Sequence, residues 1–137
     1  MFFERTNRFV GFLLLALAVG FAVPAAAPGN AQDRFAAPNA AYAKKDFATA
    51  HRLWLEIAEE GNASAYFNLG RLYFFGEGVP LDPLEAYKWF YLADKQGFPQ
   101  AKSGVIRVRA LMTPEDLTEA MRRVERWYDQ HPSTRRP

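Results

Sequence analysis

The stretch that decides the fold is "ASAYFNLGRLYFFGEGVPLDPLEAYKWFYLADKQGFPQA", residues 63–101 of a 137-residue chain. Its apolar residues recur every three or four positions, which is the spacing of one face of an α-helix. A glycine-rich segment in its middle, Gly76-Glu77-Gly78, separates two such helical patterns. No window of the chain alternates as a β-strand does. The stretch therefore predicts a helical hairpin.

The same pattern repeats along the chain with a period of thirty-six residues. Residues 46–72 align without a gap on residues 82–108, and a third, partial copy begins at Thr113. The matching pairs include Ala50 with Ala86, Gly61 with Gly97 and Arg71 with Arg107. Because one hairpin alone leaves an apolar face uncovered, successive hairpins have to stack. The sequence thus predicts an all-α fold, a short α-solenoid of antiparallel helix hairpins with about two and a half repeats.

Local signals mark the ends of the expected helices. Asp82 and Thr113 each stand before a proline, which places a capping side chain ahead of a proline at the first helical position. Asp46 and Asn62 are simpler caps, and Gly61 and Gly97 stand where a helix ends with positive φ. The expected helices cover about residues 37–44, 47–60, 63–75, 83–96, 99–111 and 114–130.

The central unit resembles a Sel1-like repeat, a relative of the tetratricopeptide repeat. The family pattern is Ala-x-x-x-Leu-Gly-x-x-Tyr, then Gly-x-Gly-Val, an Asp, and Ala-x-x-Trp-aromatic with a closing Gly and Ala. Its positions are filled here by Ala65, Leu69, Gly70, Tyr73, Gly76, Gly78, Val79, Asp82, Ala86, Trp89, Phe90, Ala93, Gly97 and Ala101. Residues 38–61 and 99–128 resemble degenerate flanking units. Ile106 and Arg109 depart from the glycine and tyrosine of the pattern, so the last hairpin is expected to be a capping unit.

The N-terminal region has the order of a secretory signal peptide. Basic residues stand before an unbroken apolar run over residues 9–23, and small residues follow it. We expect residues 1–31 to be a signal peptide cut between Ala31 and Gln32, residues 32–131 to be the repeat domain, and residues 132–137 to be a disordered tail. The expected location is periplasmic or secreted. A retained segment that anchors the chain at the inner membrane is the alternative.

Composition excludes several kinds of site. The chain has no cysteine, so disulfides, cysteine-ligated zinc and a lipid-anchoring cysteine are excluded. Removal of residues 1–31 would leave 15 basic and 14 acidic residues, a balance that does not favour nucleic acid as a partner. The two histidines, His51 and His131, lack neighbours at metal-ligand spacing, and no cofactor or metal is expected. Glu77 between the two glycines would repel a phosphate, so Gly76-Glu77-Gly78 is interpreted as a turn.

The resemblance implies where a partner would bind. In tetratricopeptide-like stacks the first helix of each hairpin lines the ligand-binding, concave side. The candidate partner-binding residues on these helices are Ser64, Phe67, Asn68, Arg71 and Phe74 in the central unit and Ser103 and Arg107 in the next. Tyr73, Phe74 and Phe75 cannot all point into one core, so at least one of them is expected outside it.

Arg71 and Arg107 suggest a basic ladder beside an aromatic patch. Such a surface suits a protein or peptide with an acidic side chain or a C-terminal carboxylate. The alternative is that both arginines pair with neighbouring acidic residues.

We therefore expect a non-catalytic protein–protein interaction module of the cell envelope, present as a monomer or a weak homodimer. One alternative is an envelope enzyme or a hydrolase-like factor that processes the cell wall. Some Sel1-like chains carry hydrolase names, but those are cysteine-rich, and no catalytic serine, histidine or carboxylate motif is evident here. The other alternative is a membrane-anchored scaffold.

Overall fold

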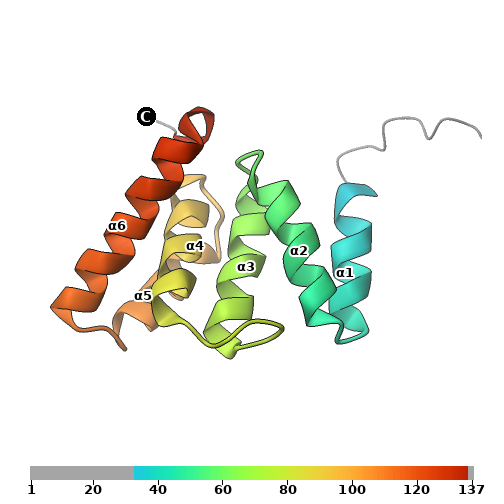
Figure 1. Ribbon diagram of the computed structural model, residues 1–137, viewed down its shortest axis with the longest axis horizontal. Coiled ribbons are helices and arrows are strands. Elements are labelled where there is room, and N and C mark those ends of the chain that lie inside the picture. The colour runs from blue at the N-terminus through green and yellow to red at the C-terminus, as the bar shows by residue number, and fades with distance from the viewer. Residues whose placement is uncertain (1–32, 136–137) are drawn as a thin grey trace, which may run out of the picture.

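The computed structural model describes residues 33–135. Within this range the chain is helical, with no β-strand. The elements are the 3₁₀-helix η1 (Asp33–Phe35), the α-helices α1 (Ala36–Ala43), α2 (Phe47–Ala58), α3 (Ala63–Phe75), α4 (Pro83–Lys95), α5 (Ala101–Arg109) and α6 (Pro114–Gln130), and the 3₁₀-helix η2 (Pro132–Thr134). Helices α1 to α4 follow one another in a row, and α5 and α6 both lie beside α4 at the far end of it (Figure 1). The predicted all-α repeat stack is confirmed.

The helices begin at the side chains that the sequence marks as caps. Asp46 accepts from the Thr49 N–H and Asn62 from the Ala65 N–H. Asp82 accepts from two backbone N–H groups of the first turn of α4. Thr113 forms a reciprocal capping box with Asp116 at the start of α6. Each cap gives a partner to a backbone donor that would otherwise have none, which fixes where these helices start.

Gly76-Glu77-Gly78 forms the turn between α3 and α4, as the sequence predicts. Gly76 ends α3 in the left-handed conformation, with φ of 67°. Gly78 has φ of 72°, and a Cβ there would lie 2.5 Å from the backbone of Phe47 at the start of α2. The two glycines therefore serve backbone geometry and the close approach of two hairpins.

The stack is built from two hairpins and a third, less regular unit. Helix α1 pairs with α2, and α3 pairs with α4, while α2 and α3 join these hairpins. In the third unit both α5 and α6 pack mainly on α4. This arrangement agrees with the capping unit that the departures at Ile106 and Arg109 indicated.

Trp127 shows how closely α6 is bound into the stack. It is buried, its Nε1 donates to the Tyr66 hydroxyl at 3.2 Å, and its ring lies against Trp89. These contacts tie α6 to both α3 and α4, so the last helix completes the core.

The prediction that residues 132–137 form a disordered tail is wrong for the first of these residues. Pro132–Thr134 form η2, and Thr134 is buried. The Thr134 carbonyl accepts from Gln96 Nε2 at 2.7 Å, and its side chain packs against Gly61. These contacts come from residues far away in the chain, so the local composition of the tail gave no sign of them. Arg136 and Pro137 lie outside the described residues.

The predicted signal peptide also lies outside the described residues. Cleavage after Ala31 and a retained anchor both remain predictions. Between residues 33 and 135, none of the helices combines the length and the apolar character that crossing a membrane requires.

Candidate functional site

A cleft opens between α3 and α5, the first helices of the second and third units, above a ring from α4. Its volume is about 230 Å³. The residues that line it are Phe67, Arg71, Phe74, Phe75, Phe90, Ser103, Gly104 and Arg107. Five of the seven candidate partner-binding residues are in this set, so the repeat offset brought together side chains from two different helices.

The floor of the cleft is the ring of Phe90, held between two glycines. A Cβ added at Gly70 of α3 would lie 2.6 Å from a Phe90 ring carbon, and one added at Gly104 of α5 would lie 2.8 Å from it. Real Cβ atoms do not approach so closely, so glycine at both positions allows α3 and α5 to flank the ring. Neither Phe90 nor Gly104 was among the site residues that the sequence predicted.

Aromatic side chains form the walls of the cleft. The Phe67 ring packs on those of Phe90 and Phe98, with centroids 5.5 and 4.8 Å apart. The Phe74 ring packs against Phe75 and Phe90. Phe75 is 56% exposed, which confirms that the aromatic run at the end of α3 leaves the core. The cleft is thus an open surface with an apolar interior.

The guanidinium of Arg71 is turned toward α1. Its Nη2 donates to the Tyr42 hydroxyl at 2.9 Å, and its guanidinium carbon lies 5.1 Å from the centre of the Tyr42 ring. The same hydroxyl donates to Glu77 Oε2 at 2.9 Å. Burial and the hydrogen bond to Glu77 raise the pKa of Tyr42, so its hydroxyl keeps its proton at neutral pH. Arg71 is therefore linked to an acidic residue through a tyrosine.

Arg107 is in a different position. It is exposed on α5, and between residues 33 and 135 no carboxylate forms an ion pair with it. The two arginines of the expected ladder both line the cleft, but only Arg71 donates a side-chain hydrogen bond to another residue of the described chain. The alternative that both arginines pair directly with neighbouring acidic residues does not hold for these two side chains.

Two candidate side chains bond to nearby backbone carbonyls. Asn68 Nδ2 donates to the Ser64 carbonyl at 3.0 Å, and neither residue lines the cleft. The Ser103 hydroxyl donates to the Gln100 carbonyl at 2.8 Å, which occupies its proton while the side chain stays in the cleft wall. Ser64 and Asn68 thus remain predictions without a place in the cleft.

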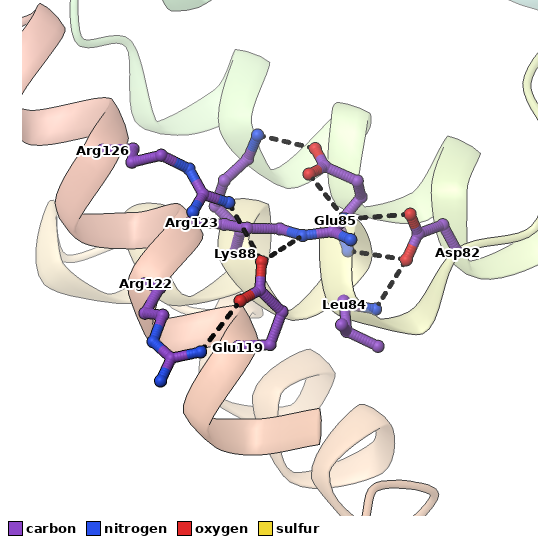
Figure 2. Close-up of polar contacts among 8 residues, drawn as sticks. All are labelled: Asp82, Leu84, Glu85, Lys88, Glu119, Arg122, Arg123 and Arg126. Atoms are coloured by element: carbon purple, nitrogen blue, oxygen red, sulfur yellow. Dashed lines mark hydrogen bonds and ion pairs between the residues drawn. The ribbon is translucent and has the colours of Figure 1, made fainter. Parts of the chain in front are cut away.

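A second group of polar residues, which the sequence did not predict, lies between α4 and α6 (Figure 2). We call it the paired face; it comprises Asp82, Glu85, Lys88, Glu119, Arg122, Arg123 and Arg126. Arg123 Nη1 lies 3.0 Å from Asp82 Oδ2 and 2.9 Å from Glu85 Oε1. Arg126 Nη2 lies 3.0 Å from Glu119 Oε1. Every charged side chain of this face has a partner of opposite sign.

Asp82 connects helix capping with the docking of α6. One of its oxygens accepts from the Leu84 and Glu85 N–H groups, and the other pairs with Arg123. Burial raises the pKa of Asp82, but the hydrogen bonds from Glu85 N–H and Arg123 outweigh burial, so the pKa lies below its ordinary value. The carboxylate is therefore ionised and holds both helices at neutral pH.

Lys88 is the most enclosed cation of the paired face. Its Nζ lies 2.6 Å from Glu85 Oε2 and 4.2 Å from the centre of the Trp89 ring. Burial lowers the pKa of Lys88, although the bond to Glu85 opposes this effect. Because its ammonium is already held by a carboxylate and a ring, the geometry indicates a structural role.

The histidines have structural partners as well. His51 Nε2 lies 3.1 Å from the Tyr73 hydroxyl. His131 Nδ1 lies 3.0 Å from the Trp127 carbonyl, at the negative end of α6. In the part of the chain that the structure describes, histidines and acidic residues form no cluster able to hold a metal ion.

Comparison with known proteins agrees with this architecture. The sequence-family model described as the Sel1 repeat matches residues 63–98 of the chain. No curated protein matches the chain. Among solved structures, the chain is similar to a protective antigen present in uropathogenic Escherichia coli strains, which displays an SLR fold, with a TM-score of 0.68 and 23% identity.

This likeness extends over 74% of the present chain and 23% of the antigen chain, so the present chain spans about a quarter of the length of that protein. At such low identity it shows the fold alone. The chain therefore contains a Sel1 repeat, residues 63–98, within a Sel1-like repeat fold.

Proposed function

We propose that this chain is a non-catalytic interaction module that binds a peptide or an extended protein segment in the cleft between α3 and α5. The observation that carries the proposal is Arg107, an arginine without an ion-pair partner in the described region, at the edge of an aromatic cleft. Apolar walls contribute affinity, and a guanidinium binds a carboxylate with directed, charge-assisted hydrogen bonds. Sel1 repeats in general suggest protein binding, which supports this proposal.

The test compares substitutions in the cleft with one outside it. The purified protein is immobilised and used to capture partners from an envelope extract, in the wild type, the double variant Arg71→Ala/Arg107→Ala and the control Lys102→Ala. Lys102 is an exposed cation of α5 that does not line the cleft. We expect the double variant to recover several-fold less partner, because an ion pair at an exposed edge contributes about 0.2–1 kcal/mol. If all three proteins recover the same amount of partner and remain folded, the partner does not bind in the cleft and the proposal is wrong.

The proposed location is the cell envelope. It is supported by the signal-peptide pattern in residues 1–31. N-terminal sequencing of the protein from its native host tests this point. A mature chain that begins at Gln32 is expected for export, whereas an intact N-terminus would favour a retained anchor.

A further inference from the structure

The chemistry of the cleft also defines what kind of segment fits it. We infer that the cleft takes one large apolar side chain, aromatic by preference, with a single carboxylate next to it, and that the apolar side chain contributes more of the affinity. This inference rests on the proposed function, because it specifies the ligand of the same cleft.

The size of the cleft fits one ring. An apolar cavity of about 150 Å³ is large enough to bind benzene. The cleft offers about 230 Å³. It therefore has room for a single aromatic or large aliphatic side chain, whereas a folded domain would have to bind over a wider surface.

The walls favour an aromatic ring in particular. The rings of Phe67, Phe74 and Phe90 already pack on one another at tilted angles, with centroids 5.5 and 6.4 Å apart for the two pairs that include Phe90. A further ring can join such a cluster edge to face, which adds about 0.5–1.5 kcal/mol to the burial of its apolar area. Gly104 lets the Phe90 ring of this cluster lie directly against α5, because a Cβ there would collide with that ring.

The polar groups of the cleft limit the charge of the ligand to one carboxylate. Arg71 is committed to Tyr42, and the Ser103 hydroxyl donates to a backbone carbonyl. Arg107 is thus the cleft's one guanidinium that the described residues leave unengaged. A strongly acidic ligand would find no second free cation in the cleft, so charge complementarity selects a mostly apolar segment with one acid. Because the carboxylate pair lies at an exposed edge, its contribution to affinity is small beside the buried side chain.

The test is a selection followed by affinity measurements. A displayed random-peptide library is selected on the wild-type protein, and enriched peptides are synthesised with the apolar residue changed to Ala or the acid changed to its amide. We expect a large apolar residue within two positions of an Asp, a Glu or the C-terminus. The Ala change should weaken binding about tenfold or more, and the amide change only several-fold, because tenfold corresponds to about 1.4 kcal/mol.

Variants of the protein locate the binding site. Ser103→Trp fills the cleft from an exposed position, and Lys102→Trp is its control on the same helix. Arg107→Met should bind the acidic peptide as the wild type binds the amide peptide. If circular dichroism shows that Ser103→Trp does not fold, Arg107→Glu takes its place, with Lys102→Glu as control.

The outcomes separate the two levels of the proposal. Peptides that bind in a Ser103-sensitive manner but tolerate the Ala change would overturn the inference and leave the proposed function intact. An absence of enriched peptides, or binding that ignores Ser103→Trp and Arg107→Glu, would overturn the proposed function itself. A dimer of the chain that disappears in Ser103→Trp would also overturn the inference, since the occupant would then be a second copy.

Discussion

Helix α4 separates two groups of arginines that differ in their partners: those on one side form ion pairs, and the one on the other side forms none within residues 33–135. On the paired face, Arg123 bonds to both Asp82 and Glu85, and Arg126 bonds to Glu119. On the cleft side, Arg107 meets no carboxylate from residues 33–135. An arginine that already bonds to acids stabilises the fold and has little left for a ligand, whereas a free one adds little stability and keeps its donors for a partner.

The comparison shows why residue type alone is a weak guide to function. Arg71 and Arg107 occupy equivalent places in successive units, yet Arg71 is linked through Tyr42 to Glu77. The difference arises because Tyr42 reaches Arg71, whereas the residue thirty-six positions after Tyr42 is Gly78, which has no side chain to reach Arg107. Equivalent places in the repeat therefore do not give the two arginines equivalent partners.

The largest expected difference in stability is between substitutions of one arginine on the paired face and one in the cleft. Arg123→Met should lower the free energy of unfolding by about 1–2 kcal/mol, because Asp82 and Glu85 lose their shared partner. Arg107→Met should change it by less than about 0.5 kcal/mol. Urea denaturation of both variants measures the difference. If both variants lose the same free energy of unfolding, the ion pairs of Arg123 do not stabilise the fold.

A smaller effect is expected at the tether of Arg71. Tyr42→Phe removes the hydroxyl that bonds to both Arg71 and Glu77, and it should lower the free energy of unfolding by about 0.5–1.5 kcal/mol. Tyr128→Phe is the matched control, because the Tyr128 hydroxyl makes no hydrogen bond within the described region. The same urea measurement applies. If the two substitutions cost the same, the Arg71–Tyr42–Glu77 link contributes no stability.

Most of the fold could be predicted because local chemistry specifies it. The bounds of α3 and α6 agree with the expected residues 63–75 and 114–130, since a side-chain cap begins each of them. Helix α5 is shorter than the expected residues 99–111 and covers Ala101–Arg109. The residue before it, Gln100 at the N-cap, makes no capping hydrogen bond with its side chain, so no local signal fixes that end.

The site could be predicted only in part, because the repeat offset holds for some contacts and fails for others. The offset groups Phe67 and Arg71 with Ser103 and Arg107. It also aligns Gly70 with Ile106, whereas Gly104 makes the equivalent close approach to Phe90. The paired face joins residues 38 and 41 positions apart, which matches no repeat period. Such contacts depend on how α6 lies on α4, and no local pattern encodes that angle.

The smallest effect tests how far the charge of the paired face reaches. His51 contacts the Tyr73 hydroxyl between the first two hairpins. Burial lowers the pKa of His51 below its ordinary value of 6.5, and the opposing charge of Glu85 on the paired face is too weak to reverse this. The unfolded chain therefore takes up the proton at higher pH than the folded protein does. The contribution of His51 to stability is fully present above about pH 6.5. It is lost as the pH falls from 6.5 toward the lower pKa that His51 has in the folded protein.

Denaturation between about pH 7.5 and pH 5.5, a range that brackets the ordinary histidine pKa, measures this effect. The free energy of unfolding should fall over this range in the wild type and in His131→Gln, which retains His51. His51→Gln, which can still bond to Tyr73 but does not titrate, should remove this part of the fall. Glu85→Gln should make the fall steeper, because the carboxylate that favours the protonated imidazole is gone. If His51→Gln keeps the full slope, burial of His51 is not its cause. If Glu85→Gln leaves the slope unchanged, the charge of the paired face does not act on His51.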